Sequence, residues 1–320
     1  MKNVKSLATV LSCMLLVTAS FAQSSKKEAP AVKGKPVPAV IIVLPGDPNG
    51  GADQGLTSGL ESYIGAPLSV TTVSRDEALK DPKYKGLNLD FMPLYLIKKT
   101  PETTKKFEDA VKNGYLKTNE EYVIFEHQTR NGVYVNRTKI PNQLDVFVMA
   151  QCPYGVMAEN RIIDAKKLGK IPANVNVNIR YIVGPGSNGE QFSSLHGTAE
   201  WEEDVRQLII KEKFPAKFWK YLEIRDKDVH SSRWDKAAED AGLNPQIFRK
   251  YWDFGVEQLK KEISYSNQYN VSASPTFIWE GRVITDFNGM GQIKALEGLA
   301  QTNFGAQGGQ GGQQAPSGQC

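Results

Sequence analysis

The expected fold follows from one run of residues, Leu144-Asp145-Val146-Phe147-Val148-Met149-Ala150-Gln151-Cys152-Pro153-Tyr154-Gly155. Its first seven residues, 144–150, are almost all apolar and predict a short buried strand. Residues 156–168 predict a helix that ends at Gly169. Cys152 is therefore expected at a strand-to-helix junction, close to the N-terminus of a helix.

This position suits a reactive thiol. Free amides and the helix dipole at a helix N-terminus stabilise a thiolate. A thiolate is the nucleophile in thiol–disulfide exchange, so Cys152 is the predicted catalytic residue. The alternative is a relic cysteine in a fold that is kept for binding.

Two motifs carry a family resemblance. Cys152-Pro153-Tyr154-Gly155 resembles the Cys-Pro-Tyr-Cys site of thioredoxin-fold proteins, with Gly155 in place of the second cysteine. Ser274-Pro275-Thr276 precedes an apolar strand and resembles the cis-proline loop of that fold. A long helical segment separates the two motifs, as in the DsbA-like branch, and the resemblance covers roughly 142–303. It implies that Pro153, Tyr154, Ser274 and Pro275 contact a substrate polypeptide.

A third motif, Ser194-Leu195-His196-Gly197-Thr198-Ala199-Glu200, is similar to the Cys-Gln-His-Gly-x-x-Glu-Cys signature of gamma-interferon-inducible lysosomal thiol reductase. Both signature cysteines are absent. The resemblance implies that His196 lies near Cys152 and favours its thiolate. The other interpretation is an ordinary capping or loop histidine.

Gly155 determines which chemistry is expected. A site with one thiol cannot store a disulfide and donate it, but it can form a mixed disulfide that a second thiol resolves. Cys320 ends a flexible segment whose reach is on the order of 20 Å, so it could resolve an intermediate at Cys152. It could equally be a free or blocked thiol.

The first half of the chain predicts a second α/β unit. Strands are expected at 39–44, 68–73 and 92–97, with a cis bond at Met92-Pro93 leading into the third. Asn131-Gly132 predicts a hairpin between 122–128 and 133–137. We interpret this order as a degenerate thioredoxin-like domain over 37–140, in front of a DsbA-like domain over 141–303. An unrelated α/β domain is the alternative.

The chain ends predict export. Residues 1–22 have the basic start, apolar stretch and small-x-small end of a signal peptide; a lipoprotein attached at Cys13 is the alternative. A disordered linker is expected at 23–36 and a flexible Gly/Gln tail at 304–320. Cleavage would place the mature chain in the periplasm or outside the cell, and no later stretch is long enough to span a membrane.

Composition narrows the function further. Loss of Lys2 and Lys5 with the signal peptide takes the formal charge from +4 to +2, which gives no argument for nucleic-acid binding. Three histidines and scattered cysteines show no metal-ligand spacing.

The predicted fold class is therefore α/β with two thioredoxin-like domains, the second DsbA-like with a helical insertion. The predicted function is a monothiol thiol–disulfide oxidoreductase or isomerase acting on protein thiols or disulfides of exported polypeptides. Two alternatives remain: a redox-inactive module that binds polypeptides or a partner protein, and an enzyme that uses glutathione as co-substrate.

Overall fold

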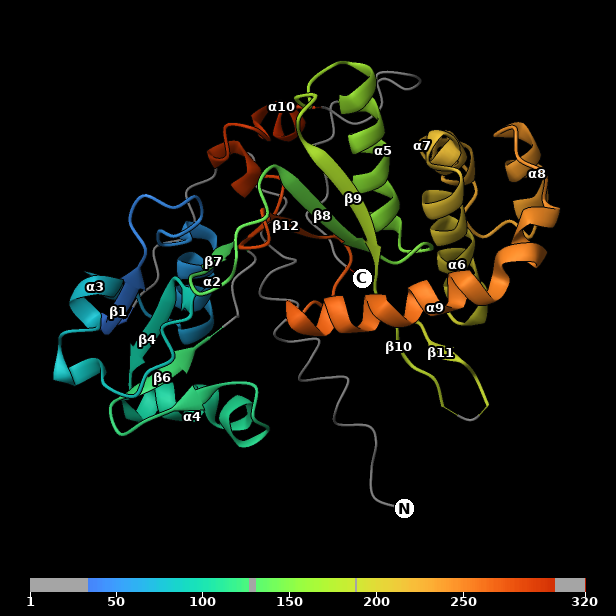
Figure 1. Cartoon of the computed structure of the whole chain (residues 1–320). Helices are drawn as coiled ribbons and strands as arrows, with labels where there is room; N and C mark the ends of the chain where they lie inside the picture. Colours follow the sequence, from blue (N-terminus) through green and yellow to red (C-terminus); the bar gives the residue numbers. More distant parts are fainter. Residues whose placement is uncertain (1–33, 127–130, 188, 303–319) are drawn as a thin grey trace. The chain divides into compact units, whose positions relative to one another are not determined.

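The computed structural model describes residues 34–126, 131–187, 189–302 and 320 (Figure 1). The predicted signal peptide, nearly all of the predicted linker, and the predicted tail up to residue 319 lie outside the described residues. The chain divides into two compact units. One contains the described residues up to Lys139 together with Arg282–Gln292; the other contains Ile140–Gly281 and the described residues from Ile293 on.

The first unit is built on a mixed five-stranded sheet in the order β2-β1-β4-β6-β5. The strands are β1 (Val37–Val43), β2 (Leu68–Ser74), β4 (Leu94–Lys98), β5 (Lys117–Thr118) and β6 (Tyr122–Phe125). β1 pairs parallel with β2 and antiparallel with β4. The helices are α2 (Gln54–Ile64), α3 (Arg75–Ala78), η2 (Pro82–Tyr84) and α4 (Pro101–Lys112).

Alternation along β1 gives the sheet two apolar faces. Ala39 and Ile41 belong to one core, which contains Phe107 of α4. Val40 and Ile42 belong to the other core. The helices begin as the sequence indicates: the Asp53 side chain caps α2, and Thr100 caps α4 with proline at its first position.

The predicted hairpin around Asn131-Gly132 is wrong. β6 pairs with β4 and β5, whereas β7 (Gly132–Tyr134) pairs antiparallel with β3 (Phe91–Met92) and β13 (Val283–Thr285). The Asn131 side chain accepts a hydrogen bond from the Asp286 amide at 3.0 Å. Long-range pairing has therefore overridden the local turn signal. η3 (Gly289–Gln292) completes this unit.

The second unit is built around β8 (Gln143–Val148). β8 pairs parallel with β9 (Asn176–Tyr181) and antiparallel with β12 (Thr276–Trp279). α5 (Pro153–Lys167) connects β8 to β9, so these elements form a β-α-β unit with an added antiparallel strand. β10 (Gly184–Pro185) and β11 (Phe192–Ser193) form a small separate ladder.

Four helices fill the predicted insertion between β9 and β12 (Figure 1). They are α6 (Thr198–Lys213), α7 (Pro215–Arg225), α8 (Trp234–Asp240) and α9 (Gln246–Gln268), and α6 contacts both α7 and α9. Trp201 of α6 is buried, and its ring contacts those of Phe192 and Trp252, so it belongs to the core of this unit. The last helix of this unit, α10, covers Glu297–Ala300.

A buried ion network ties the insertion to the sheet. Arg180 Nε lies 3.0 Å from an Asp145 carboxylate oxygen, and Arg180 Nη1 lies 3.1 Å from a Glu262 carboxylate oxygen. Because β8, β9 and α9 each supply one member, the network joins three elements.

Candidate functional site

Strand register brings Cys152 and Ser274 together. In the antiparallel pair β8–β12, Thr276 lies opposite Phe147, so the residues before β12 lie beside the residues after β8. Ser274 Oγ accepts a hydrogen bond of 3.0 Å from the Met149 amide. The Ser274–Pro275 peptide bond is cis, as is Met92–Pro93. The Cys152 motif and the Ser274-Pro275 motif thus meet at one edge of the sheet.

Cys152 is the N-cap residue of α5. Its sulfur accepts a hydrogen bond from the Gly155 amide, with an N–S distance of 3.4 Å. Pro153 is exposed at the first helical position and Tyr154 is half-buried beside it. When Cys152 carries a thiolate, the free amide and the helix dipole both stabilise that charge.

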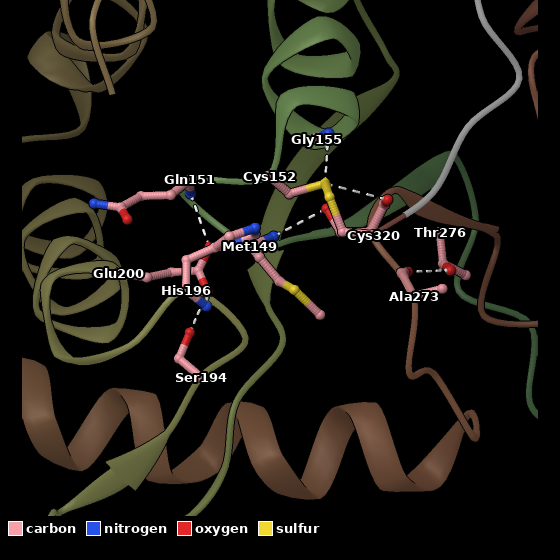
Figure 2. Close-up of a disulfide and its surroundings, with 11 residues drawn as sticks. Met149, Gln151, Cys152, Gly155, Ser194, His196, Glu200, Ala273, Thr276 and Cys320 are labelled. Carbon is pink, nitrogen blue, oxygen red and sulfur yellow. Dashed lines mark hydrogen bonds and ion pairs between the residues drawn. A yellow bond between two sulfur atoms is a disulfide. The ribbon is translucent and has the colours of Figure 1, made fainter. Parts of the chain in front are cut away.

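Cys152 is disulfide-bonded to Cys320, with a Cα–Cα distance of 6.0 Å (Figure 2). This corrects the prediction of a centre with a single cysteine, because the second sulfur comes from residue 320. Cys152 is 0 % exposed in this disulfide-bonded form, whereas a reactive thiol has to be reachable by its substrate. The disulfide disagrees with the alternative of a free or blocked thiol at Cys320, and the resolving role of Cys320 stays a prediction.

Gly155 shows why the second sulfur does not come from the helix. A Cβ atom at residue 155 would lie 2.6 Å from Ser274 Oγ and 3.2 Å from the Met149 carbonyl oxygen. Contacts this short require a neighbour to move, and Ser274 Oγ is already held by the Met149 amide. The Ser274 hydroxyl therefore occupies the space that a side chain at residue 155 needs.

The backbone of Ser274 binds Cys320. The Cys320 amide donates to the Ser274 carbonyl at 2.9 Å, and the Ser274 amide donates to the Cys320 carbonyl at 3.4 Å. The Cys152 sulfur lies 3.5 Å from the same Ser274 carbonyl oxygen. Ser274 is completely buried. Its hydroxyl binds the Met149 amide, and both of its backbone groups bind Cys320.

His196 reaches the site through Glu200. The imidazole Nδ1 lies 2.7 Å from Glu200 Oε1, and the same carboxylate oxygen accepts the Gln151 amide at 3.0 Å (Figure 2). The other carboxylate oxygen binds the Ser194 hydroxyl and the His196 amide. The side-chain hydrogen bonds of His196 thus go to Glu200 rather than Cys152, and Glu200 links the third motif to the residue before the cysteine.

Buried carboxyl groups lie behind the Cys152 loop. Asp204 on α6 accepts the Ala150 amide at 3.3 Å. Glu159 follows Cys152 by two turns of α5, is 0 % exposed, and neither of its carboxyl oxygens has a hydrogen-bond partner in the described part of the chain. Burial raises the pKa of Glu159 well above its ordinary value, and the nearby Asp226 and Asp204 charges raise it further. Burial likewise raises the pKa values of Asp204 and Asp226.

The local sequence pattern does not reveal this cluster of buried carboxyl groups. A glutamate on the polar face of a helix is ordinarily solvated, and nothing in the local pattern distinguishes Glu159 from such a residue. The signal available in the sequence is the run of acidic residues at the start of α6. Acidic residues at a helix N-terminus ordinarily compensate the helix dipole at the surface, whereas Glu200, Glu203 and Asp204 are all buried.

Within the described ranges, no group of histidine, cysteine and acidic side chains could hold a metal ion. Within the same ranges, no helix combines the length and apolar character needed to cross a bilayer. Neither observation bears on the alternative in which glutathione is a co-substrate.

No protein-family model matches the chain, and no curated protein sequence matches it significantly. Solved structures do. BdbD from Bacillus subtilis, in its oxidised form, is similar over 51 % of this chain and 90 % of its own, at 16 % identity and a TM-score of 0.40. The DsbA disulfide interchange protein from Klebsiella pneumoniae covers 56 % and 94 %, at 16 % identity and a TM-score of 0.38.

A third similar structure is MdbA, a thiol-disulfide oxidoreductase from Corynebacterium diphtheriae. It covers 52 % of this chain and 89 % of its own, at 13 % identity and a TM-score of 0.38. Each of the three similarities covers about half of this chain. The chemistry has to be inferred from the residues of this chain.

Proposed function

We propose that this protein is a thiol–disulfide oxidoreductase whose redox couple is Cys152 and Cys320. The observation that carries the proposal is the disulfide at the N-terminus of α5, where the Gly155 amide contacts the Cys152 sulfur. When the disulfide is reduced, this amide and the helix dipole stabilise a thiolate at residue 152. Cys152 is therefore the attacking sulfur, and Cys320 takes the role that the missing cysteine at residue 155 would have.

The proposed exchange conserves bonds and electrons between the protein and its substrate. The Cys152 thiolate attacks one sulfur of a substrate disulfide, forms a mixed disulfide, and the other substrate sulfur leaves as a thiolate that takes a proton from water. The Cys320 thiolate then attacks Cys152 Sγ and releases the second substrate thiolate. The enzyme loses two electrons and the substrate gains two. The reverse sequence oxidises a substrate dithiol, and the relative reduction potentials decide the direction.

Single-turnover exchange with a peptide that contains one disulfide tests the proposal. All chains carry Cys13→Ser, so that Cys152 and Cys320 are the only thiols. The reduced chain is expected to reduce one peptide disulfide per molecule. Cys152→Ser should be inactive, and Cys320→Ser should accumulate a mixed disulfide at Cys152 that mass spectrometry detects. If the Cys152→Ser chain reacts as fast as the chain that keeps both Cys152 and Cys320, the assignment of the nucleophile is refuted.

One observation favours a second function. Cys152 is fully buried in the disulfide-bonded form, as expected of a structural disulfide in a module that only binds polypeptides. The two functions differ in how readily the disulfide is reduced. A redox-active disulfide equilibrates with a glutathione buffer, whereas structural disulfides typically have potentials below about −300 mV and resist it. A Cys152–Cys320 disulfide that stays oxidised in such a buffer supports the binding module.

We further propose that the protein is exported before it acts, on protein thiols or disulfides in an oxidising compartment. Residues 1–22 carry this part of the proposal. Mass spectrometry of the protein from a fractionated cell tests it: a mature N-terminus at Gln23 is expected outside the cytoplasm. Recovery of the intact chain in the cytoplasm contradicts it, and an N-terminal lipid-modified cysteine at residue 13 supports the lipoprotein instead.

A further inference from the structure

Cys320 is bound in two ways, by its sulfur and by its backbone. Besides the disulfide, it exchanges two main-chain hydrogen bonds with Ser274, of 2.9 and 3.4 Å. Two residues that exchange both N–H···O bonds form the hydrogen-bonded pair of an antiparallel ladder. Cys320 therefore pairs with Ser274, the residue before Pro275, as one residue of an added strand would.

The backbone groups of Ser274 need a partner. Its side chain is bound to the Met149 amide, and the next residue is a proline without an N–H group. In the disulfide-bonded chain Ser274 is 0 % exposed, and Cys320 supplies the hydrogen-bond partner of both backbone groups. When Cys320 leaves, these two groups must bind water or the backbone of another chain. An extended polypeptide offers the donor and acceptor pair that Cys320 offers.

We infer that Cys320 is an internal competitor for the polypeptide substrate, which would pair with Ser274 through the backbone of the cysteine that bonds to Cys152. This inference rests on the proposed oxidoreductase function. In the reduced chain, Ser274 is available and the site accepts an extended, cysteine-containing segment. In the oxidised chain, Cys320 occupies both the sulfur position and the backbone position, so the site is closed.

The same geometry couples chemistry to product release. After Cys152 has formed a mixed disulfide with the substrate, the Cys320 thiolate attacks Cys152 Sγ and the substrate sulfur leaves as a thiolate, which takes a proton from water. The new Cys152–Cys320 bond brings the Cys320 backbone back to Ser274. One residue thereby takes over the covalent bond and both backbone hydrogen bonds that held the product.

Peptide binding tests the inference without requiring turnover. The probe is an extended peptide with serine in place of its cysteine, so that it cannot exchange disulfides. We expect the reduced chain to bind it at least tenfold more tightly than the oxidised chain by isothermal titration calorimetry. Cys320→Ser, which cannot form the disulfide, should bind it under reducing and oxidising conditions alike. The same peptide N-methylated at that serine is the matched control and should bind at least several-fold more weakly.

Amide hydrogen exchange measured by NMR locates the effect. The Ser274 amide should be protected in the oxidised chain, should exchange at least tenfold faster after reduction, and should regain protection when the peptide is added. The Met149 amide, which donates to Ser274 Oγ, is the internal reference and should stay protected throughout.

The two proposals fail separately. If the peptide binds oxidised and reduced chains equally while Cys152 still exchanges disulfides, the competition is refuted and the oxidoreductase stands. If Cys152 exchanges no disulfide, the proposed function itself fails.

Discussion

Gly155→Ala tests whether the helix position and the Ser274 hydroxyl exclude each other. The added Cβ would lie 2.6 Å from Ser274 Oγ, which has to move away from the Met149 amide that it holds at 3.0 Å. Met149 is 6 % exposed, so its amide gains little from water when that hydrogen bond breaks. The substitution therefore disturbs a buried hydrogen bond as well as packing.

The magnitude follows from these contacts. An unpaired buried amide costs about 1–3 kcal/mol, and crowding a packed site costs a similar amount. Alanine in place of glycine inside a helix returns about 1 kcal/mol. We expect Gly155→Ala to lower the free energy of unfolding by about 2 kcal/mol. In a Ser274→Ala background there is no hydroxyl to displace, so the same change should cost less than about 1 kcal/mol.

Urea denaturation of the four oxidised chains, followed by tryptophan fluorescence, measures this coupling. We expect a coupling energy of about 1–2 kcal/mol. Gly291→Ala is the control, because a Cβ at residue 291 meets no atom within 4 Å, and its effect should be within about 0.5 kcal/mol in both backgrounds. If Gly155→Ala costs the same with and without the Ser274 hydroxyl, the proposed exclusion is refuted.

Three further predictions concern the groups around the site. Because the pKa of Glu159 is raised in the folded chain, its carboxyl group contributes stability that is present below the unfolded pKa of about 4.3 and is lost as the pH rises. Glu159→Gln should therefore raise the free energy of unfolding by roughly 1–3 kcal/mol at pH 8 and change it little at pH 4. Equal effects at both pH values would contradict this prediction. Glu200→Ala should lower the free energy of unfolding by about 2–4 kcal/mol, because several hydrogen-bond donors lose their acceptor. The side chain of His196 is 29 % exposed, so His196→Ala should lower it by less than about 1 kcal/mol. Thermal unfolding compares the two variants, and similar losses would refute the central role of Glu200. Arg180→Ala leaves two buried carboxylates without their cation and should cost about 3–5 kcal/mol in urea; a loss below 1 kcal/mol would show that the network adds no stability.

The elements around Cys152 could be predicted because local patterns determine them. A short apolar run followed by Cys-Pro and a helical period leaves few alternatives, and the strand and helix are found where that pattern indicates. Ser274 and Pro275 could be placed for the same reason, since they precede an apolar strand directly.

The features that depend on distant pairing could not be predicted in this way. The Asn131-Gly132 turn signal is strong locally, but β7 pairs with strands far from it in sequence. α7 was not predicted, although Pro215 stands at its first position. The first unit ends at Lys139, next to the predicted boundary at 140, but Arg282–Gln292 also belong to it rather than to the second unit. Local propensity carries no information about which distant segment completes a sheet.

The absent cysteine at residue 155 and the disulfide to residue 320 have one physical explanation. Ser274 uses its hydroxyl on the Met149 amide and lies beside Gly155, so a side chain at residue 155 would have to displace that hydroxyl. The backbone of the same serine pairs with Cys320 and holds its sulfur against Cys152. A residue without this hydroxyl before Pro275 would leave room for a side chain at 155 but would retain the backbone pair. The position of the second sulfur therefore depends on the side chain of residue 274, whereas binding of an extended chain depends on its backbone.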